Sequence, residues 1–224
     1  MMKLPEKDRH DFKRTFLKHI QALFNFPAVD DFAGKVDMIN SCLSQNGYAV
    51  EPITEKGVVA ASTGKMFIEL QNGLLTIRMD AVSYVGFKPF LGECDILIDL
   101  LGKVGVKTLE MVIMQKLNVY VFSKERYPNG LSMTDVERSL FSEDFIAQGL
   151  ACTAGDYEKI TVLAQRKFAE QESKYTATLT LTTMAQHSIP LSQTISCLEE
   201  ENQMLYNMFH WTTSDRLREL MDKD

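Results

Sequence analysis

The sequence predicts an α+β fold in which an antiparallel-rich sheet carries helices packed on one side. The segment Met66–Phe122 supplies the three observations behind this prediction. Asn72-Gly73 accepts the positive φ values of a type I′ turn, so MFIELQNGLLTIRMD predicts a β-hairpin. Apolar residues then recur at three- and four-residue spacing over 89–104, which predicts an amphipathic helix. A run rich in β-branched and long apolar residues follows, and it predicts a long strand that ends near Phe122.

The chain before the hairpin contains one segment with two interpretations and one clear helix. Between Thr15 and Phe26, apolar residues alternate as in a strand, yet from Phe12 onward they also fit a helical stripe. The residues alone leave both interpretations open. From Val29 the apolar spacing alternates between three and four, which predicts a helix of about four turns that ends before Gly47. Short strands are expected near 57–62, 66–71 and 74–80.

The second half of the chain begins at its strongest turn signal, Tyr127-Pro128-Asn129-Gly130. Ser132 or Thr134 is expected to cap a short helix that runs through Val136, Leu140 and Phe141, and its extension to Phe145 and Ile146 is left open. The remaining elements expected are strands over Ile160–Phe168 and Tyr175–Thr183, and a last helix from Pro190 to near the C-terminus.

The order of these elements repeats along the chain. Each half reads strand, helix, strands, helix, although the residues of the two halves do not match. We therefore expect one α+β domain over 1–224, with duplication of a strand-helix-strands-helix unit as a hypothesis. The two similar halves would be 14–105 and 106–222.

Composition excludes several classes of protein. The chain has 224 residues, 45% of them hydrophobic, which is enough for a substantial core and argues against a disordered chain. The net charge of −6 disfavours a nucleic-acid partner. No apolar run predicts a membrane span, and the N-terminal stretch lacks the apolar region of a secretory signal. The four cysteines are far apart, which favours reduced thiols and a cytoplasmic location.

The sequence contains no recognisable catalytic or cofactor motif. Gly102–Thr108 is glycine-rich, but it follows a helix and precedes a strand, the reverse of a phosphate-binding loop. The four histidines lack the spacing of metal ligands. Carboxylate pairs such as Asp95 and Asp99 lie on the polar side of a predicted helix. We therefore predict no catalytic residue, no metal and no cofactor, and the interpretation favours a protein that is not an enzyme.

Three segments carry a resemblance to a known family. FLKHIQALFNFP, FIELQNGLLTIRMD and MLYNMFHWTTSDRLRELM are similar to segments of a sporadically distributed family of uncharacterised bacterial and archaeal proteins of this length, with Phe209 and Thr213 at typical positions. The family's Arg-Tyr-x-Asn strand motif corresponds here to Gln115-Lys116-Leu117-Asn118, so the Asn alone matches. The resemblance implies a strand over Thr15–Phe26. It also implies an accessory role in defence or on mobile elements.

The candidate binding residues are Asn118, Tyr206, His210 and Trp211. His210 adjoins the one tryptophan late in a helix, beside Tyr206. Neighbours on a helix point about 100° apart, so these side chains cannot all face one core. The leading hypothesis is a non-catalytic intracellular accessory protein that binds a protein partner or self-associates, which the twelve methionines also favour. The alternative is a small-molecule or nucleotide sensor with its ligand in a cleft between the two halves.

Overall fold

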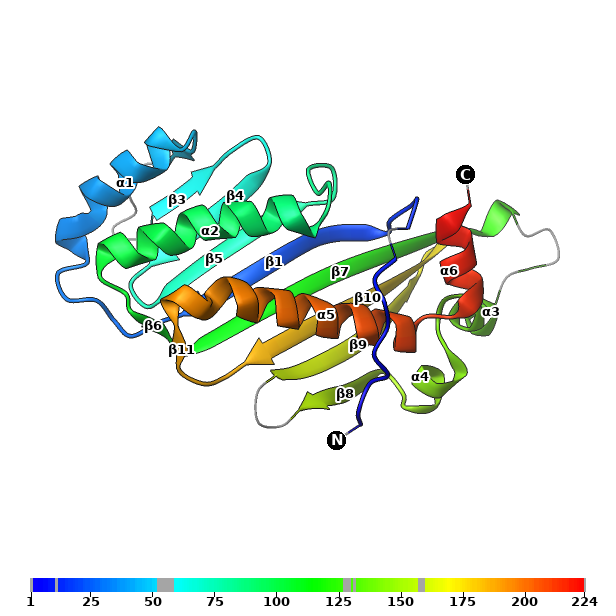
Figure 1. The fold of residues 1–224 in the computed structure, drawn as a ribbon. Helices are drawn as coiled ribbons and strands as arrows, with labels where there is room; N and C mark the ends of the chain where they lie inside the picture. Colours follow the sequence, from blue (N-terminus) through cyan, green and yellow to red (C-terminus); the bar gives the residue numbers. More distant parts are fainter. Residues whose placement is uncertain are drawn as a thin grey trace. The chain divides into compact units, whose positions relative to one another are not determined.

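The computed structural model describes residues 2–10, 12–51, 59–126, 130, 132–156 and 160–223, and it has the predicted α+β architecture (Figure 1). Among these residues, hydrogen bonds join nine strands into an antiparallel sheet in the order β2-β3-β4-β5-β1-β7-β10-β9-β8. The strands are β1 (Leu17–Asn25), β2 (Ala49–Val50), β3 (Val59–Ser62), β4 (Met66–Gln71), β5 (Leu74–Asp80), β7 (Met111–Ser123), β8 (Ala151–Asp156), β9 (Ile160–Glu170) and β10 (Lys174–Ala185). The short strands β6 (Thr108–Leu109) and β11 (Ile189–Pro190) pair separately.

The helices of the described residues are α1 (Val36–Gln45), α2 (Phe87–Val104), α3 (Met133–Leu140), α4 (Glu143–Ala147), α5 (Thr194–Thr212) and α6 (Asp215–Asp222). In the part of the chain that the structure describes, none of these helices has the length and apolar character needed to cross a membrane.

The chain forms two compact units, each assembled from separate segments. Unit 1 consists of residues 1–18, 115–183 and 202–224, and unit 2 consists of residues 19–114 and 184–201. Strands β1, β7 and β10 and helix α5 contribute residues to both units. The duplication of halves 14–105 and 106–222 stays a prediction.

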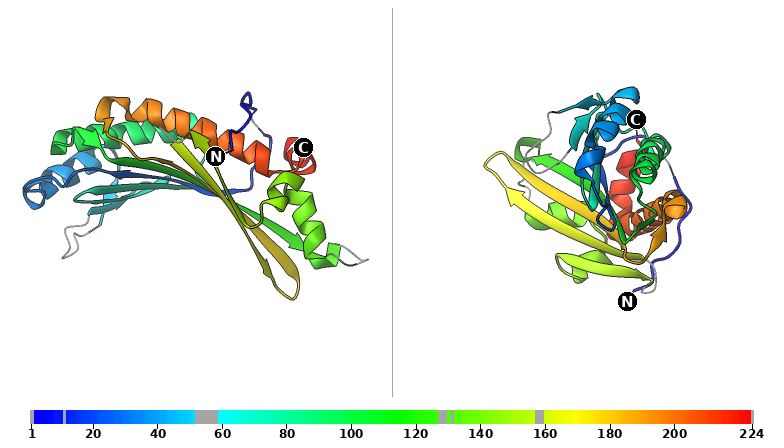
Figure 2. Two further views of the ribbon diagram at one scale, coloured as in Figure 1. Left: turned by 90° about the horizontal axis from the view of Figure 1, so that it is seen from below. Right: turned by 90° about the vertical axis from the view of Figure 1, so that its left-hand side faces the viewer.

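Unit 2 contains the hairpin that the sequence predicts. β4 and β5 pair in antiparallel register from Met66 opposite Met79 to Gln71 opposite Leu74, and Gly73 has the positive φ of +93° that the turn requires. Along β4, buried and half-buried residues alternate, which places one face of the strand against α2 (Figures 1 and 2). This alternation is typical of an antiparallel sheet covered on one side only.

The segment with two interpretations is a strand. β1 pairs with β5 from His19 opposite Asp80 to Asn25 opposite Leu74, and its even-numbered residues from Ile20 to Phe24 are buried. The strand interpretation is correct because β5 and β7, the two neighbours of β1 in the sheet, together satisfy its main chain, whereas the helical stripe would have placed Ala22 away from the core.

Helix α1 is shorter than predicted. The sequence predicted a helix from Val29, but α1 begins at Val36 after a 3₁₀ turn over Ala33–Lys35. Asp31 adopts a left-handed φ of +51°, which a continuous helix does not allow. The C-terminal end agrees with the prediction, because Gly47 has a φ of +81° just past the helix.

In unit 1 the structure adds one strand and divides one helix. The short helix after the central turn is α3, which begins with a capping box between Ser132 and Asp135. Phe145 and Ile146 belong to a separate helix, α4, which Ser142 caps. Strand β8, opposite β9 in antiparallel register, was not predicted. Residues 127–129 of the predicted turn lie outside the described residues.

The last helix is also two helices rather than the one predicted. α5 ends at Thr212, and α6 begins after Ser214, whose hydroxyl accepts the Leu217 amide at 3.1 Å. The Thr212 hydroxyl donates to the Met208 carbonyl at 2.8 Å, and the Thr213 hydroxyl donates to the Phe209 carbonyl at 2.6 Å. These side chains occupy carbonyls at the end of the helix and so favour its termination.

Candidate functional site

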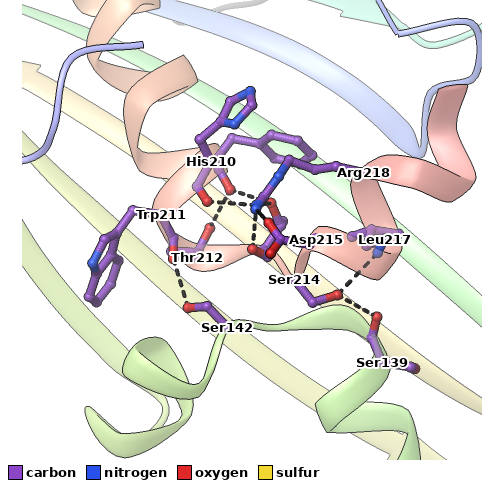
Figure 3. A network of polar contacts seen from close by, with 11 residues as sticks. Ser139, Ser142, His210, Trp211, Thr212, Ser214, Asp215, Leu217 and Arg218 are labelled. Atoms are coloured by element: carbon purple, nitrogen blue, oxygen red, sulfur yellow. Dashed lines mark hydrogen bonds and ion pairs between the residues drawn. The ribbon is translucent and has the colours of Figure 1, made fainter.

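The junction between α5 and α6 is held by Arg218 (Figure 3). Its Nη1 donates to the His210 carbonyl at 2.7 Å and to the Thr213 hydroxyl at 2.9 Å, and it also contacts the Thr213 carbonyl. Its Nη2 pairs with Asp215. One guanidinium thus satisfies carbonyls at the end of α5 that have no partner within the helix, and it neutralises the negative end of the helix dipole.

Two serines tie this junction to the neighbouring short helices. The Ser142 hydroxyl donates to the Trp211 carbonyl at 2.7 Å, and the Ser214 hydroxyl donates to the Ser139 carbonyl at 2.7 Å (Figure 3). Each serine is also the N-cap of its own helix, so one hydroxyl accepts an amide and donates to a carbonyl at the same time. The geometry of the junction is therefore fixed by hydroxyl groups at the N-caps of α4 and α6 that bind main-chain carbonyls of α5 and α3.

A cavity of about 420 Å³ opens at this junction, within unit 1. Its lining combines aromatic rings, hydroxyl groups and charges of both signs. The lining residues are Pro5, Lys7, Arg138, Phe141, Ser142, Glu143, His210, Trp211, Thr213, Ser214, Asp215 and Arg218. Such a mixture can bind a polar or charged group beside an apolar anchor.

His210 lies in an environment that keeps its ring neutral. Its pKa is lowered to about 4, chiefly by burial and then by the neighbouring basic groups of Arg218, Lys7 and His10. Its Nε2 is buried and has no hydrogen-bond partner among the described residues. The ring centroid lies 4.6 Å from that of Tyr206 and 5.9 Å from that of Phe12. At neutral pH His210 is therefore an uncharged aromatic contact and not a proton donor.

Trp211 lies on the α4 side of the junction. Its ring centroid is 5.9 Å from that of Phe145, and the side chain is half-buried. Beneath Phe145, the guanidinium of the buried Arg166 lies 5.1 Å from the ring centroid and pairs with Glu137 at 2.9 Å. Trp211 thus packs against Phe145 and also lines the cavity, as an anchoring residue of an interface does.

Asn118 lies elsewhere. It is 7% exposed, on the helix-facing side of β7 between Lys116 and Tyr120, and it does not line the cavity. The Lys116 Nζ donates to Asn202 Oδ1 on α5 at 2.7 Å. Burial lowers the pKa of Lys116 to about 8, and the charge of Arg9 adds to the effect. The motif segment 115–118 is therefore part of a polar layer between strand and helix.

The four candidate residues thus divide into two places. His210 and Trp211 line the cavity, Tyr206 adjoins His210 on α5, and Asn118 is separate. The sequence interpretation missed Arg138, Ser142 and Arg218. Ser142 carried a signal, because Ser-Glu-Asp before an apolar pair is typical of a helix start. The sequence around Arg218 contains no such signal, because its hydrogen-bond partners become available only where α5 ends and α6 begins.

No metal site is evident where the structure can be described: no three His, Cys, Asp or Glu side chains lie close enough to hold an ion. The four cysteines are free thiols. Burial raises the pKa of Cys152 to about 11 and that of Cys197 to about 12, and it raises the pKa of Cys94 as well. These thiols are accordingly poor nucleophiles at neutral pH.

Comparisons with known proteins find only distant likenesses. No family model matches the sequence, and no curated protein matches it. The regulatory subunit of aspartate kinase from Thermus thermophilus aligns over 84% of this chain and 91% of its own, with 14% identity and a TM-score of 0.22. Aspartate kinase from Clostridium acetobutylicum aligns over 85% of this chain and 33% of its own, with 8% identity and a TM-score of 0.23. Likenesses of this size carry no argument about function.

Proposed function

We propose that this protein is a non-catalytic accessory protein that binds a protein partner at the cavity beside the end of α5. The observation that carries the proposal is the position of Trp211, which packs against Phe145 and lines the cavity. Tryptophan and arginine dominate the binding energy of protein interfaces because they bury large areas while keeping a polar handle.

The charged side chains at the cavity indicate which chemical groups a partner would present there. Arg218 is engaged by the junction itself, so Arg138 supplies a cationic side chain for an incoming group, and Glu143 supplies an anionic one. A partner surface with an apolar side chain flanked by a carboxylate fits this lining. A second copy of the chain is a candidate partner under the same proposal.

The proposal also includes where the protein is located in the cell and the biological process in which it takes part. A cytoplasmic location is supported by the four free thiols, which persist in a reducing compartment. The role in defence or on mobile elements implied by the family resemblance belongs to the proposal as well. Its support is the similarity of the three segments described above.

Affinity isolation from the native host, compared between variants, tests the proposal. Trp211→Ala removes the anchoring ring, and we expect it to reduce capture of the partner about ten-fold or more, the loss typical of an interface anchor. Leu150→Ala is the matched control, because Leu150 is 64% exposed and does not line the cavity. Equal capture by both variants would contradict the proposal. Sedimentation of the wild type at micromolar concentration separates self-association from binding to another protein.

A second candidate function is binding of a small anionic molecule. The cavity volume falls in the range of about 300–1,000 Å³ found for small-molecule sites, and Lys7 and Arg138 are suited to an anion. A ligand cleft between the halves 14–105 and 106–222 stays a prediction. Because Trp211 is the one tryptophan, its fluorescence reports on the cavity directly. Titration with pyrophosphate and with succinate tests this candidate, and unchanged emission up to millimolar concentration would contradict it.

A further inference from the structure

The N-terminal segment of the chain lies extended across α5 in unit 1. Residues 3–10 have no helical or strand structure, and Figure 1 shows this segment, in dark blue, crossing the C-terminal half of α5. We refer to residues Pro5–His10 as the strap. Pro5 and Lys7 of the strap also line the cavity at the end of α5. The strap therefore connects the helix face to the candidate site.

The middle of the strap is held through its main chain. The Lys7 amide donates to Asn207 Oδ1 at 3.1 Å, and Gln203 Nε2 donates to the Lys7 carbonyl at 2.9 Å. The His10 amide donates to the Tyr206 hydroxyl at 2.7 Å. These three side chains of α5 lie three and four residues apart, so they project from one face of the helix. They recognise an extended backbone and not particular side chains.

The receiving side chains are also held in position by one another. Gln203 Nε2 donates to Asn207 Oδ1 at 3.0 Å, so the two amide groups are oriented together. Gln203 Oε1 accepts a hydrogen bond from the Arg9 Nε at 3.0 Å, which adds a side-chain contact at the centre of the strap. Preorganised amide groups of this kind reduce the entropic cost of ordering an extended guest.

Side-chain anchors lie at the end of the strap. His10 Nε2 and Asp222 Oδ1 of α6 are 2.6 Å apart. Phe12 packs against Phe209 and stacks on His210, with ring centroids 5.9 Å apart in each case. A cationic or histidine side chain followed by an aromatic ring therefore fits the end of α5, where Asp222 of α6 complements positive charge.

We propose that this face of α5 is a docking site for an extended, cationic segment of a partner protein, and that the chain's own strap occupies it until it is displaced. Main-chain recognition tolerates other sequences, as it does where an extended peptide adds to the edge of a sheet. The strap's bonds to Gln203 and Tyr206 are largely exposed, and exposed bonds contribute little net free energy, so exchange is feasible.

This inference deepens the proposed function. It rests on that proposal in one respect, which is that the ligand is a polypeptide. The cavity at Trp211 would hold the partner's apolar anchor, and the strap site would hold the extended segment beside it. The two sites share Pro5 and Lys7, which belong to the strap and line the cavity, but they use different side chains of α5. Gln203 and Asn207 bind the strap and Trp211 lines the cavity, so variants at Gln203 and at Trp211 can test the two sites separately.

The experiment uses full-length protein and a fluorescein-labelled peptide with the sequence MKLPEKDRHDFKR, which is residues 2–14 of this chain. Lys7→Pro removes the amide N–H that Asn207 binds and keeps an extended backbone. Lys7→Ala is the matched control, since it removes the same side chain and keeps the amide. By fluorescence anisotropy, we expect Lys7→Pro to bind the peptide about five-fold more tightly than Lys7→Ala, the equivalent of about 1 kcal/mol.

Further variants decide whether the peptide binds at α5. Gln203→Ala in the Lys7→Pro background should abolish the gain, whereas Trp211→Ala should leave the peptide affinity unchanged within about two-fold, because Trp211 is not among the strap's partners. Equal affinity of Lys7→Pro and Lys7→Ala would overturn the inference, as would indifference to Gln203→Ala. Dimerisation of Lys7→Pro without peptide would assign the site to a second copy and overturn the partner assignment. The proposed function and this inference can also fail separately. If the peptide binds at α5 as expected but Trp211→Ala still captures the partner, the proposed function is refuted and this inference stands.

Discussion

Replacing Arg218 by methionine should destabilise the protein by about 2–3 kcal/mol. The variant keeps the length of the side chain and loses the guanidinium that bonds to the His210 carbonyl, the Thr213 carbonyl and the Thr213 hydroxyl. A hydrogen bond contributes about 1 kcal/mol net, and three are lost. The side chain is 19% exposed and the cavity admits water to the freed carbonyls, so the higher values for buried charged donors do not apply. The ion pair with the 90% exposed Asp215 adds little.

Urea and thermal unfolding, followed by circular dichroism, measure the effect. For a chain of this size, about 2–3 kcal/mol corresponds to a fall in the melting temperature of roughly 4–12 °C. Arg216→Met is the matched control, because Arg216 lies on the same helix, is exposed and is expected to change stability by less than about 0.5 kcal/mol. If the two variants melt together, the guanidinium does not hold the α5–α6 junction, and the argument for a fixed cavity fails.

Three further predictions follow from buried polar groups. Because the pKa of Lys116 is lowered to about 8 from 10.5, the unfolded chain binds more protons between these values; the free energy of unfolding should therefore rise from pH 8 to 10.5 in the wild type and not in Lys116→Met. Tyr120→Phe removes a buried hydroxyl that has no partner among the described residues, so urea unfolding should show no loss of stability; a loss above about 1 kcal/mol would reveal a missed bond. The buried Cys94 should react with Ellman's reagent at pH 8 only after unfolding, and rapid labelling in the native protein would contradict its burial.

Much of the fold was predictable because it depends on local patterns. The hairpin between β4 and β5 is encoded by Asn72-Gly73 and by alternation on both sides of it. Helix α2 is encoded by its apolar stripe and by Gly105, which has a φ of +107° at its end. Strand β8 could not be predicted, since Ala151–Asp156 contains small and polar residues whose strand conformation depends on pairing with β9.

The candidate site was predictable only in part. His210 and Trp211 stood out by composition, and both line the cavity. Tyr206 and Asn118 were grouped with them, but Asn118 lies beneath α5 in a polar layer with Lys116. Nothing in the sequence of the strap specifies its structure. Its order comes from amide side chains nearly two hundred residues further along the chain.

The amino-acid sequence by itself determined the α+β class, the central hairpin, helix α2 and the long strand β7, because turn chemistry and hydrophobic period act over a few residues. The tertiary structure alone decided that α5 ends at Thr212, that Arg218 closes the junction, and that the strap lies on Gln203, Tyr206 and Asn207. These features depend on hydrogen bonds between distant segments. A side chain acquires such hydrogen-bond partners only after the surrounding elements have packed, so no local sequence pattern can predict these partners.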